Sequence, residues 1–302
     1  PDEEGRQRAK AETGAKRTYA DYKEMLERES LDLVSVCPRW VDCHLEMVLA
    51  CVEAGCHVYC EKPMAMRLDD ADRMVSAADC GHVRIAVAHQ GVYLPQTREA
   101  KRLVESGRIG TPHTVYAWGK QDHRGGGEDT MVLGTHLFNT MRFFFSEVAW
   151  MFAHVTVEGR EIGPGDVRDG NEPIGPVAGD CVESYFSFQS GVSGFFRSRA
   201  NSHPGDRPYG MEIAGQEGRL ALWGGSPDQI FLYPYGGSAP SGPDRAWQRL
   251  NVETAPYTEG NRRAIQDLIQ SIEEDRDPLS SGRDATSALE MILGAYESQI
   301  TG

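Results

Sequence analysis

The chain has 302 residues; 40% are hydrophobic and 25% are charged, and 31 basic against 45 acidic residues give a formal net charge of −14. This composition is typical of a globular protein with one large or two ordinary domains. The acidic balance argues against binding to nucleic acid or to an anionic membrane surface, and no apolar run reaches the roughly 18 residues of a membrane-spanning helix.

Strands and helices alternate over the first third of the chain. Apolar residues of Val41–Ala54 recur at helical spacing, and Gly55 ends that segment. Helices are predicted at Glu3–Thr13, Tyr22–Glu29, Val41–Ala54, from Asp69 onward and at Pro95–Ser106, and strands at Leu31–Val36, His57–Cys60 and Val83–Ala88. This order predicts a parallel sheet with right-handed crossovers.

After Pro112 the pattern changes to that of a mostly antiparallel sheet with few helices, an α+β arrangement. Ser184–Phe188 alternates polar with aromatic residues, and Gln189–Gly191 is typical of a hairpin turn. Strands are predicted at His113–Trp118, Val148–Val157, Val182–Phe188, Val192–Arg199, Tyr209–Ala214, Arg219–Trp223 and Gln229–Tyr233, and helices at Thr130–Phe145, Arg262–Glu274 and Ala285–Ile300.

The tripeptide Glu61-Lys62-Pro63 follows a predicted strand and precedes a predicted helix. Open α/β sheets bind their ligands at the carboxyl ends of strands, where this turn lies. Proline restricts the residue before it, so the backbone sets the direction of the lysine. Lys62 is therefore a candidate for holding a substrate hydroxyl and stabilising negative charge on its oxygen. An ordinary solvated lysine on a surface turn is the alternative.

A second candidate group follows a glycine run in the second half of the chain. Gly125–Gly127 precedes a predicted helix, and these glycines either form a flexible lead-in or allow a ligand to approach the backbone. At about 100° per residue, Asp129 and His136 share one helix face, about two turns apart. Both side chains are thus placed to reach one substrate molecule. A structural histidine is the alternative interpretation of His136.

The seven cysteines are odd in number and the chain is not small, so we expect free thiols rather than a disulfide framework. Cys56, His57 and Cys60 lie close in sequence, but no second ligand pair has a metal-site spacing, and we expect no metal site. We expect a cytoplasmic protein, and an export signal before Pro1 stays an open alternative.

Five short motifs follow one another along the chain: Cys37-Pro38, the tripeptide at 61–63, Glu105–Gly110, Gly125–Gly127 and Gly134-Thr135-His136. In this order they resemble the glucose–fructose oxidoreductase/inositol dehydrogenase (Gfo/Idh/MocA) family, and the resemblance covers nearly the whole chain. The resemblance implies a dinucleotide-binding Rossmann domain over residues 1–110 and an α+β domain for substrate binding and oligomerisation over residues 111–302. No G-x-G-x-x-G follows a predicted strand. On this resemblance the first Rossmann strands and the glycine loop would precede Pro1, leaving an incomplete parallel sheet.

The resemblance also implies roles for individual residues. The family's lysine falls on Lys62 and its catalytic histidine on His136, while the aspartate usually found four residues before that histidine is replaced by Val132. Asp129 is the expected substitute. The family's second acid, three residues after the histidine, is Asn139. Residues expected to border a bound NAD or NADP are Cys37, Pro38, His44, Glu61 and Lys62, and expected substrate contacts are Tyr93, His123, Asn201 and His203.

The activity implied is oxidation of a secondary alcohol on a sugar or cyclitol, with hydride transfer to NAD or NADP. His136 would accept the hydroxyl proton, because imidazole titrates near neutrality. Two alternatives stay open: an NAD-dependent glycosidase and a non-catalytic ligand-binding relative. A homo-oligomer is expected through the open face of the second sheet.

Overall fold

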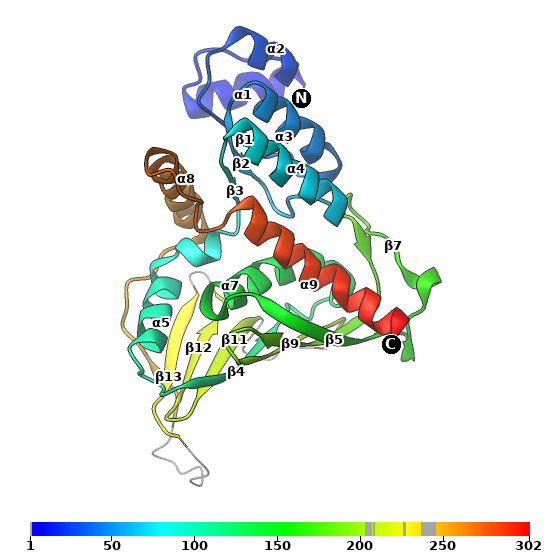
Figure 1. Ribbon diagram of the computed structural model, residues 1–302, viewed down its shortest axis with the longest axis vertical. Coiled ribbons are helices and arrows are strands. Elements are labelled where there is room, and N and C mark those ends of the chain that lie inside the picture. Colours follow the sequence, from blue (N-terminus) through cyan, green and yellow to red (C-terminus); the bar gives the residue numbers. More distant parts are fainter. Residues whose placement is uncertain (1, 203–206, 208, 226–227, 237–245) are drawn as a thin grey trace.

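The structure is a computed structural model, and it describes all residues except 1, 203–206, 208, 226–227 and 237–245. The described strands form a three-stranded sheet, a nine-stranded sheet and the two-stranded β7–β8 ribbon (Arg168–Asp169 and Pro176–Val177). In Figure 1 the small sheet and helices α1–α4 form one end of the molecule, and the large sheet lies toward the other. The expected α/β class with two unlike sheets is confirmed.

The small sheet is parallel throughout, with strand order β1-β2-β3. Its strands are β1 (Leu33–Val36), β2 (His57–Cys60) and β3 (Ile85–Val87), and the helices of this part are α1 (Glu3–Thr13), α2 (Tyr22–Arg28), α3 (His44–Glu53), α4 (Leu68–Gly81) and α5 (Pro95–Glu105). Asp21 caps α2, because its side chain accepts a hydrogen bond from the backbone nitrogen of Lys23. Because β1 and β2 are parallel neighbours, their carboxyl ends lie side by side.

The large sheet has the strand order β14-β13-β12-β11-β4-β10-β9-β5-β6. Its strands are β4 (Pro112–Trp118), β5 (Val148–Val157), β6 (Arg160–Glu161), β9 (Cys181–Phe188), β10 (Ser193–Arg199), β11 (Gly210–Gly215), β12 (Arg219–Trp223), β13 (Gln229–Tyr233) and β14 (Gln248–Arg249). All described neighbours are antiparallel except β4 and β10. The predicted hairpin is confirmed, since Ser193 pairs with Ser187 across the turn.

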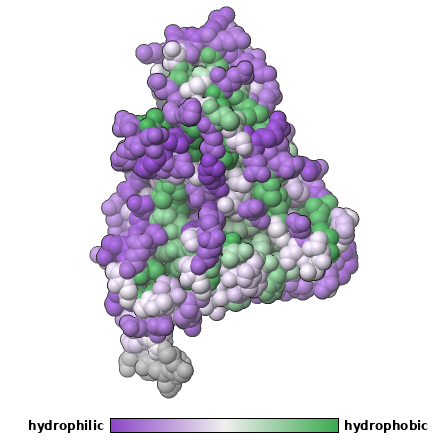
Figure 2. Space-filling view, in the orientation of Figure 1, coloured by the Kyte–Doolittle hydropathy of each residue, from purple (hydrophilic) through white to green (hydrophobic). Residues whose placement is uncertain are grey.

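The helices among the described residues cover one face of the large sheet. In Figure 1, α7 (Thr135–Phe145) and α9 (Gly282–Thr301) lie together along one side of it. Alternate residues of β9, such as Val182 and Phe186, are buried on that side. On the side of the molecule shown in Figure 2, apolar patches lie scattered among hydrophilic residues.

The opposite face carries a row of aromatic side chains from four adjacent strands. Trp150 and Phe152 are more than half exposed, and Tyr116 is 46% exposed. Tyr185 stacks against Phe152 at 5.3 Å between ring centroids. Phe195, in the strand between, is 5.2 Å from both Tyr185 and Tyr116. We call Tyr116, Trp150, Phe152, Tyr185 and Phe195 the aromatic row.

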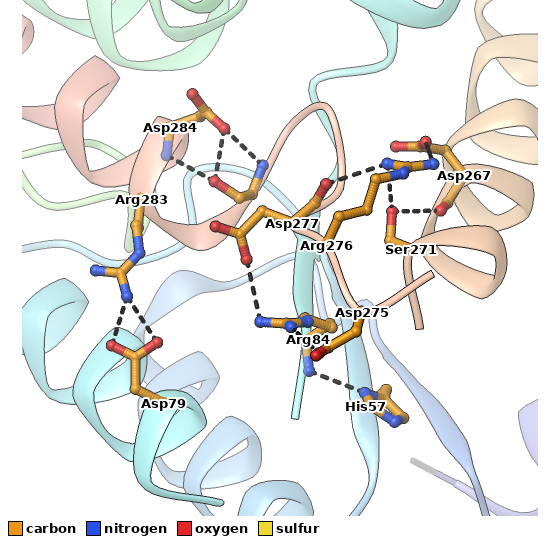
Figure 3. A network of polar contacts seen from close by, with 11 residues as sticks. His57, Asp79, Arg84, Asp267, Ser271, Asp275, Arg276, Asp277, Arg283 and Asp284 are labelled. Atoms are coloured by element: carbon orange, nitrogen blue, oxygen red, sulfur yellow. Dashed lines mark hydrogen bonds and ion pairs between the residues drawn. The ribbon is translucent and has the colours of Figure 1, made fainter. Parts of the chain in front are cut away.

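The link between α8 (Tyr257–Glu273) and α9 ties the two parts of the molecule together through charge. Arg84, which precedes β3, donates to Asp275 at 2.6 Å and to Asp277 at 3.3 Å (Figure 3). Arg283, at the start of α9, contacts Asp79 of α4 at 2.6 Å. These contacts hold the small sheet in a defined position against the second part. No helix within the described residues has the length and apolarity that crossing a bilayer requires.

Candidate active site

A cavity of about 780 Å³ opens where the carboxyl ends of β1 and β2 meet the segment between β4 and α7. From the small-sheet side it is lined by Cys37, Arg39, Glu61, Lys62 and Pro63. From the other side it is lined by residues that include Lys120, His123, Arg124, Glu128, Asp129 and Val132. The two parts of the chain therefore share one cavity, as the strand-end argument predicted for Lys62.

The loops after β1 and β2 are joined by His44. One ring nitrogen lies 3.0 Å from the carbonyl oxygen of Pro38, and the other lies 3.2 Å from that of Pro63. The His44 ring is fully buried. The sequence interpretation placed His44 and Pro38 beside a cofactor. The structure puts His44 between the two loops, where it sets their spacing, and Cys37, Glu61 and Lys62 line the cavity; the contacts with a cofactor stay a prediction.

Lys62 reaches across the cavity to the second part of the chain. Its ammonium nitrogen donates to the carbonyl oxygen of Val132 at 3.1 Å. Burial lowers the pKa of Lys62; the negative charge of Glu61 opposes this shift, and the positive charge of Lys120 adds to it. Because Val132 lies four residues before His136, this bond brings the lysine to the turn that leads to the histidine.

The segment before His136 is not the regular helix that the sequence predicted. A short helical turn, Gly127–Asp129, is followed by a π-helical turn, Thr130–Gly134, and the α-helix begins only at Thr135. A π turn holds more residues than an α turn, so the predicted angle between Asp129 and His136 does not apply here. Such turns are frequent at functional sites, and this one directs a carbonyl group toward Lys62.

His136 is partly buried, and its Nδ1 atom is buried without a hydrogen-bond partner in the described structure. Its ring lies edge-on to His89, with 5.6 Å between centroids, and 6.5 Å from the Tyr257 ring. Burial holds the pKa of His136 well below the ordinary 6.5, and the charge of Lys62 acts in the same direction. The imidazole is consequently neutral and able to accept a proton at neutral pH.

Asp129 lies in the same cavity but is held by its own hydrogen bonds. One carboxylate oxygen accepts from the backbone nitrogen of Lys120 at 2.9 Å and from the hydroxyl of Ser198 at 2.8 Å. Burial raises the pKa of Asp129, and these two bonds oppose the rise. The contacts place Asp129 at the junction of the loop after β4 with β10, next to the cavity.

The glycine run before Asp129 serves close packing of backbones. Gly126 has φ +87°, and a Cβ atom there would lie 2.5 Å from the Gly179 carbonyl oxygen. A Cβ on Gly125 would lie 2.3 Å from the Arg199 carbonyl carbon. The glycines therefore let the cavity-lining loop sit against the segments before and after the β9–β10 hairpin.

The predicted substrate contacts are only partly brought together. His123 lines the cavity, and exposed Asn201 lies beside it, bonded through its backbone nitrogen to the Asp122 carbonyl oxygen. His203 lies outside the described residues. Tyr93 lines a separate cavity of about 450 Å³, where its hydroxyl donates to Asp267 at 3.2 Å.

Two residues near the site were missed by sequence reasoning. Lys120 follows β4 in the same way that Lys62 follows β2, and that strand-end position was a usable signal. His89 follows β3; it is buried, and its ring contacts the hydroxyls of Thr135 at 2.8 Å and Ser280 at 3.3 Å. Burial lowers the pKa of His89 to about 3. Only the tertiary contact with His136 marks it.

Comparison with known proteins gives consistent matches. Residues 1–89 match the sequence model of an oxidoreductase family with an NAD-binding Rossmann fold, and residues 97–221 match that of the GFO/IDH/MocA C-terminal domain. A myo-inositol 2-dehydrogenase of Thermotoga maritima is 27% identical over 96% of this chain and 84% of its own. An NAD-binding oxidoreductase of Klebsiella pneumoniae has a similar structure, with a TM-score of 0.79, 21% identity, and coverage of 99% and 86% of the two chains. An Agrobacterium radiobacter oxidoreductase in complex with NAD+ and L-tartaric acid aligns with a TM-score of 0.75, 18% identity, and coverage of 99% and 86%.

Proposed function

The chain belongs to the Gfo/Idh/MocA family of oxidoreductases, whose two domain models together match more than half of it, and from this membership we propose that it oxidises a secondary alcohol of a sugar or cyclitol by hydride transfer to NAD or NADP. The similarity to a myo-inositol 2-dehydrogenase supports this substrate class. The observation that supports the proposal is the bond from the cavity-lining Lys62 to Val132, in the turn that leads to His136.

The residues at the cavity fit a nicotinamide. Cys37 and Glu61 line it from the adjacent carboxyl ends of two parallel strands, the position at which such sheets take dinucleotides. The buried Nδ1 of His136 has no hydrogen-bond partner within the described residues, so the protein alone does not complete its bonding. When bound, the nicotinamide supplies the acceptor for hydride.

The chain's own residues carry out the proton chemistry in this proposal. The ammonium of Lys62 holds the substrate hydroxyl and stabilises negative charge on its oxygen as the proton leaves. His136, neutral because of burial, accepts that proton at a ring nitrogen. Asp129 orients the loop that carries Lys120.

We also propose that residues 1–110 and 111–302 act as a cofactor-binding and a substrate-binding domain, and that the aromatic row pairs with a second copy of this chain. Four adjacent strands present these rings on a face that the described helices leave open. An aromatic face of this kind is typical of an interface. A monomeric mass at micromolar concentration would contradict the pairing. A cytoplasmic location stays a prediction.

The test of the proposed function is direct. The chain is titrated with NAD(H) and NADP(H), and the reduced nicotinamide is then followed during incubation with myo-inositol and a panel of aldoses. Binding of one cofactor and substrate-dependent reduction are expected. Sugar release from a glycoside without net reduction would indicate a hydrolase instead. Absence of binding to all four nucleotides would leave a non-catalytic ligand-binding protein as the better account.

A further inference from the structure

Five of the ten Asp, Glu, Lys and Arg side chains that line the cavity form ion pairs. Each of three arginines has one acidic partner: Arg39 pairs with Glu172, Arg124 with Asp122 at 3.0 Å, and Arg168 with Glu128 at 3.5 Å. Asp122 lies outside the cavity lining, and the other five side chains of these pairs belong to it. A ligand therefore meets mainly the charges that remain outside such pairs.

The remaining carboxylates of the lining are also engaged. Glu61 accepts from the backbone nitrogen of Lys62 at 2.6 Å, and Asp180 from that of Glu158 at 2.8 Å. Asp129 accepts from Ser198 and from the backbone of Lys120, as described above. Each acceptor is thus held by a neighbouring group of the protein.

Lys120 differs from these groups and from Lys62. The ammonium of Lys62 donates to the Val132 carbonyl oxygen, whereas the ammonium of Lys120, which lines the same cavity, forms no hydrogen bond and no ion pair within the described residues. An ammonium group in a partly buried site is stabilised when a bound acceptor, above all an anion, completes its hydrogen bonds.

We propose that Lys120 binds an anionic group of the substrate, so that the preferred substrate is an acidic polyol bearing a carboxylate or a phosphate ester. An ammonium group is a compact charge with three donors and forms strong hydrogen bonds to either anion. Lys62 then holds the reacting hydroxyl, and Lys120 holds the anion. This inference rests on the proposed function, because it treats the cavity as the substrate site.

The experiment compares ligands that differ in the anionic group. Binding of glucose, glucuronate and glucose 6-phosphate, and of galactose and galacturonate, is measured by calorimetry with and without NAD+. We expect at least one acid to bind about tenfold or more tightly than its neutral partner. Whether a carboxylate or a phosphate gives the larger ratio identifies the anion.

The variants assign the effect to one residue. Lys120→Gln is expected to bring the acid-to-neutral ratio close to one, and Lys120→Arg to retain most of it. Lys23→Gln removes the same charge from an exposed lysine of α2 that pairs with Glu46, and the ratio should not change. Thermal unfolding of each variant verifies that it is folded.

Two results would overturn the inference: no acid that binds better than its neutral partner, or an unchanged ratio in a folded Lys120→Gln variant. The outcome is separable from that of the proposed function. Turnover of neutral sugars without acid preference would defeat this inference alone. Binding of acids through Lys120 without any nicotinamide reduction would defeat the proposed function alone.

Discussion

The two sides of the cavity are built in different ways. On the small-sheet side, β1 and β2 each end in a short loop with a proline, and the buried His44 joins the two loops. On the other side, one irregular segment from Gly119 to Gly134 carries Lys120 and Asp129 and leads to His136, and distant strands hold it in place. The comparison teaches that local sequence places Lys62, whereas long-range packing places Asp129 and His136.

The largest expected effect follows from removing His136. His136→Asn keeps a polar side chain but no longer accepts a proton, so turnover should fall by about 10²- to 10⁴-fold. His113→Asn, at an exposed position of β4, is the control. Steady-state kinetics with the best substrate measure the loss. Turnover within a few-fold of the parent chain would show that the histidine is structural.

Lys62 tests the opposite side of the cavity. Lys62→Met removes the charge that stabilises the developing oxyanion, and kcat should fall by about 10²- to 10³-fold. Lys101→Met, which removes a lysine on α5 that donates to the Phe143 carbonyl oxygen, is the matched control. If Lys62→Met raises KM and leaves kcat unchanged, the lysine binds substrate without acting in the chemical step.

The glycine run tests the role of packing. Gly126→Ala should lower the free energy of unfolding by about 2–4 kcal/mol, because the new Cβ meets a backbone oxygen and φ is positive. Gly14→Ala also has positive φ, but no other atom lies within 4 Å of its Cβ, so about 1 kcal/mol is expected. Urea unfolding measures both. Equal losses would show that the backbone contact at Gly126 is unimportant.

The smallest effects are expected in the pH dependence. Lys62 has a lowered pKa, so on raising the pH it loses its charge earlier than an ordinary lysine, and kcat/KM should begin to fall below pH 10.5. Because the pKa of His136 is also lowered, the acid limb should lie below pH 6.5.

Lys120→Gln should shift both limbs of the pH profile of kcat/KM. Removing that charge should raise the pKa of both Lys62 and His136, so both limbs should move to higher pH. An acid limb above pH 6.5 in the parent chain would contradict a buried neutral imidazole.

Many of the secondary-structure elements, and the turn that carries Lys62, could be predicted from the sequence. Period-two and period-3.6 patterns, with Gly and Pro at their ends, predicted the parallel strands, the β9–β10 hairpin and the turn that carries Lys62. Such features depend on neighbours in sequence, and the residues that decide them lie within a few positions of one another.

Other features were decided only by the assembled structure. The π turn before His136, the hydrogen bonds of Asp129 to Ser198 and Lys120, and the contact of His89 with His136 all join residues distant in sequence or depart from regular helical geometry. The same holds for His44, whose ring joins the loops after β1 and β2. Burial and charge at such positions depend on which segments pack together, and no periodicity in the chain records that packing.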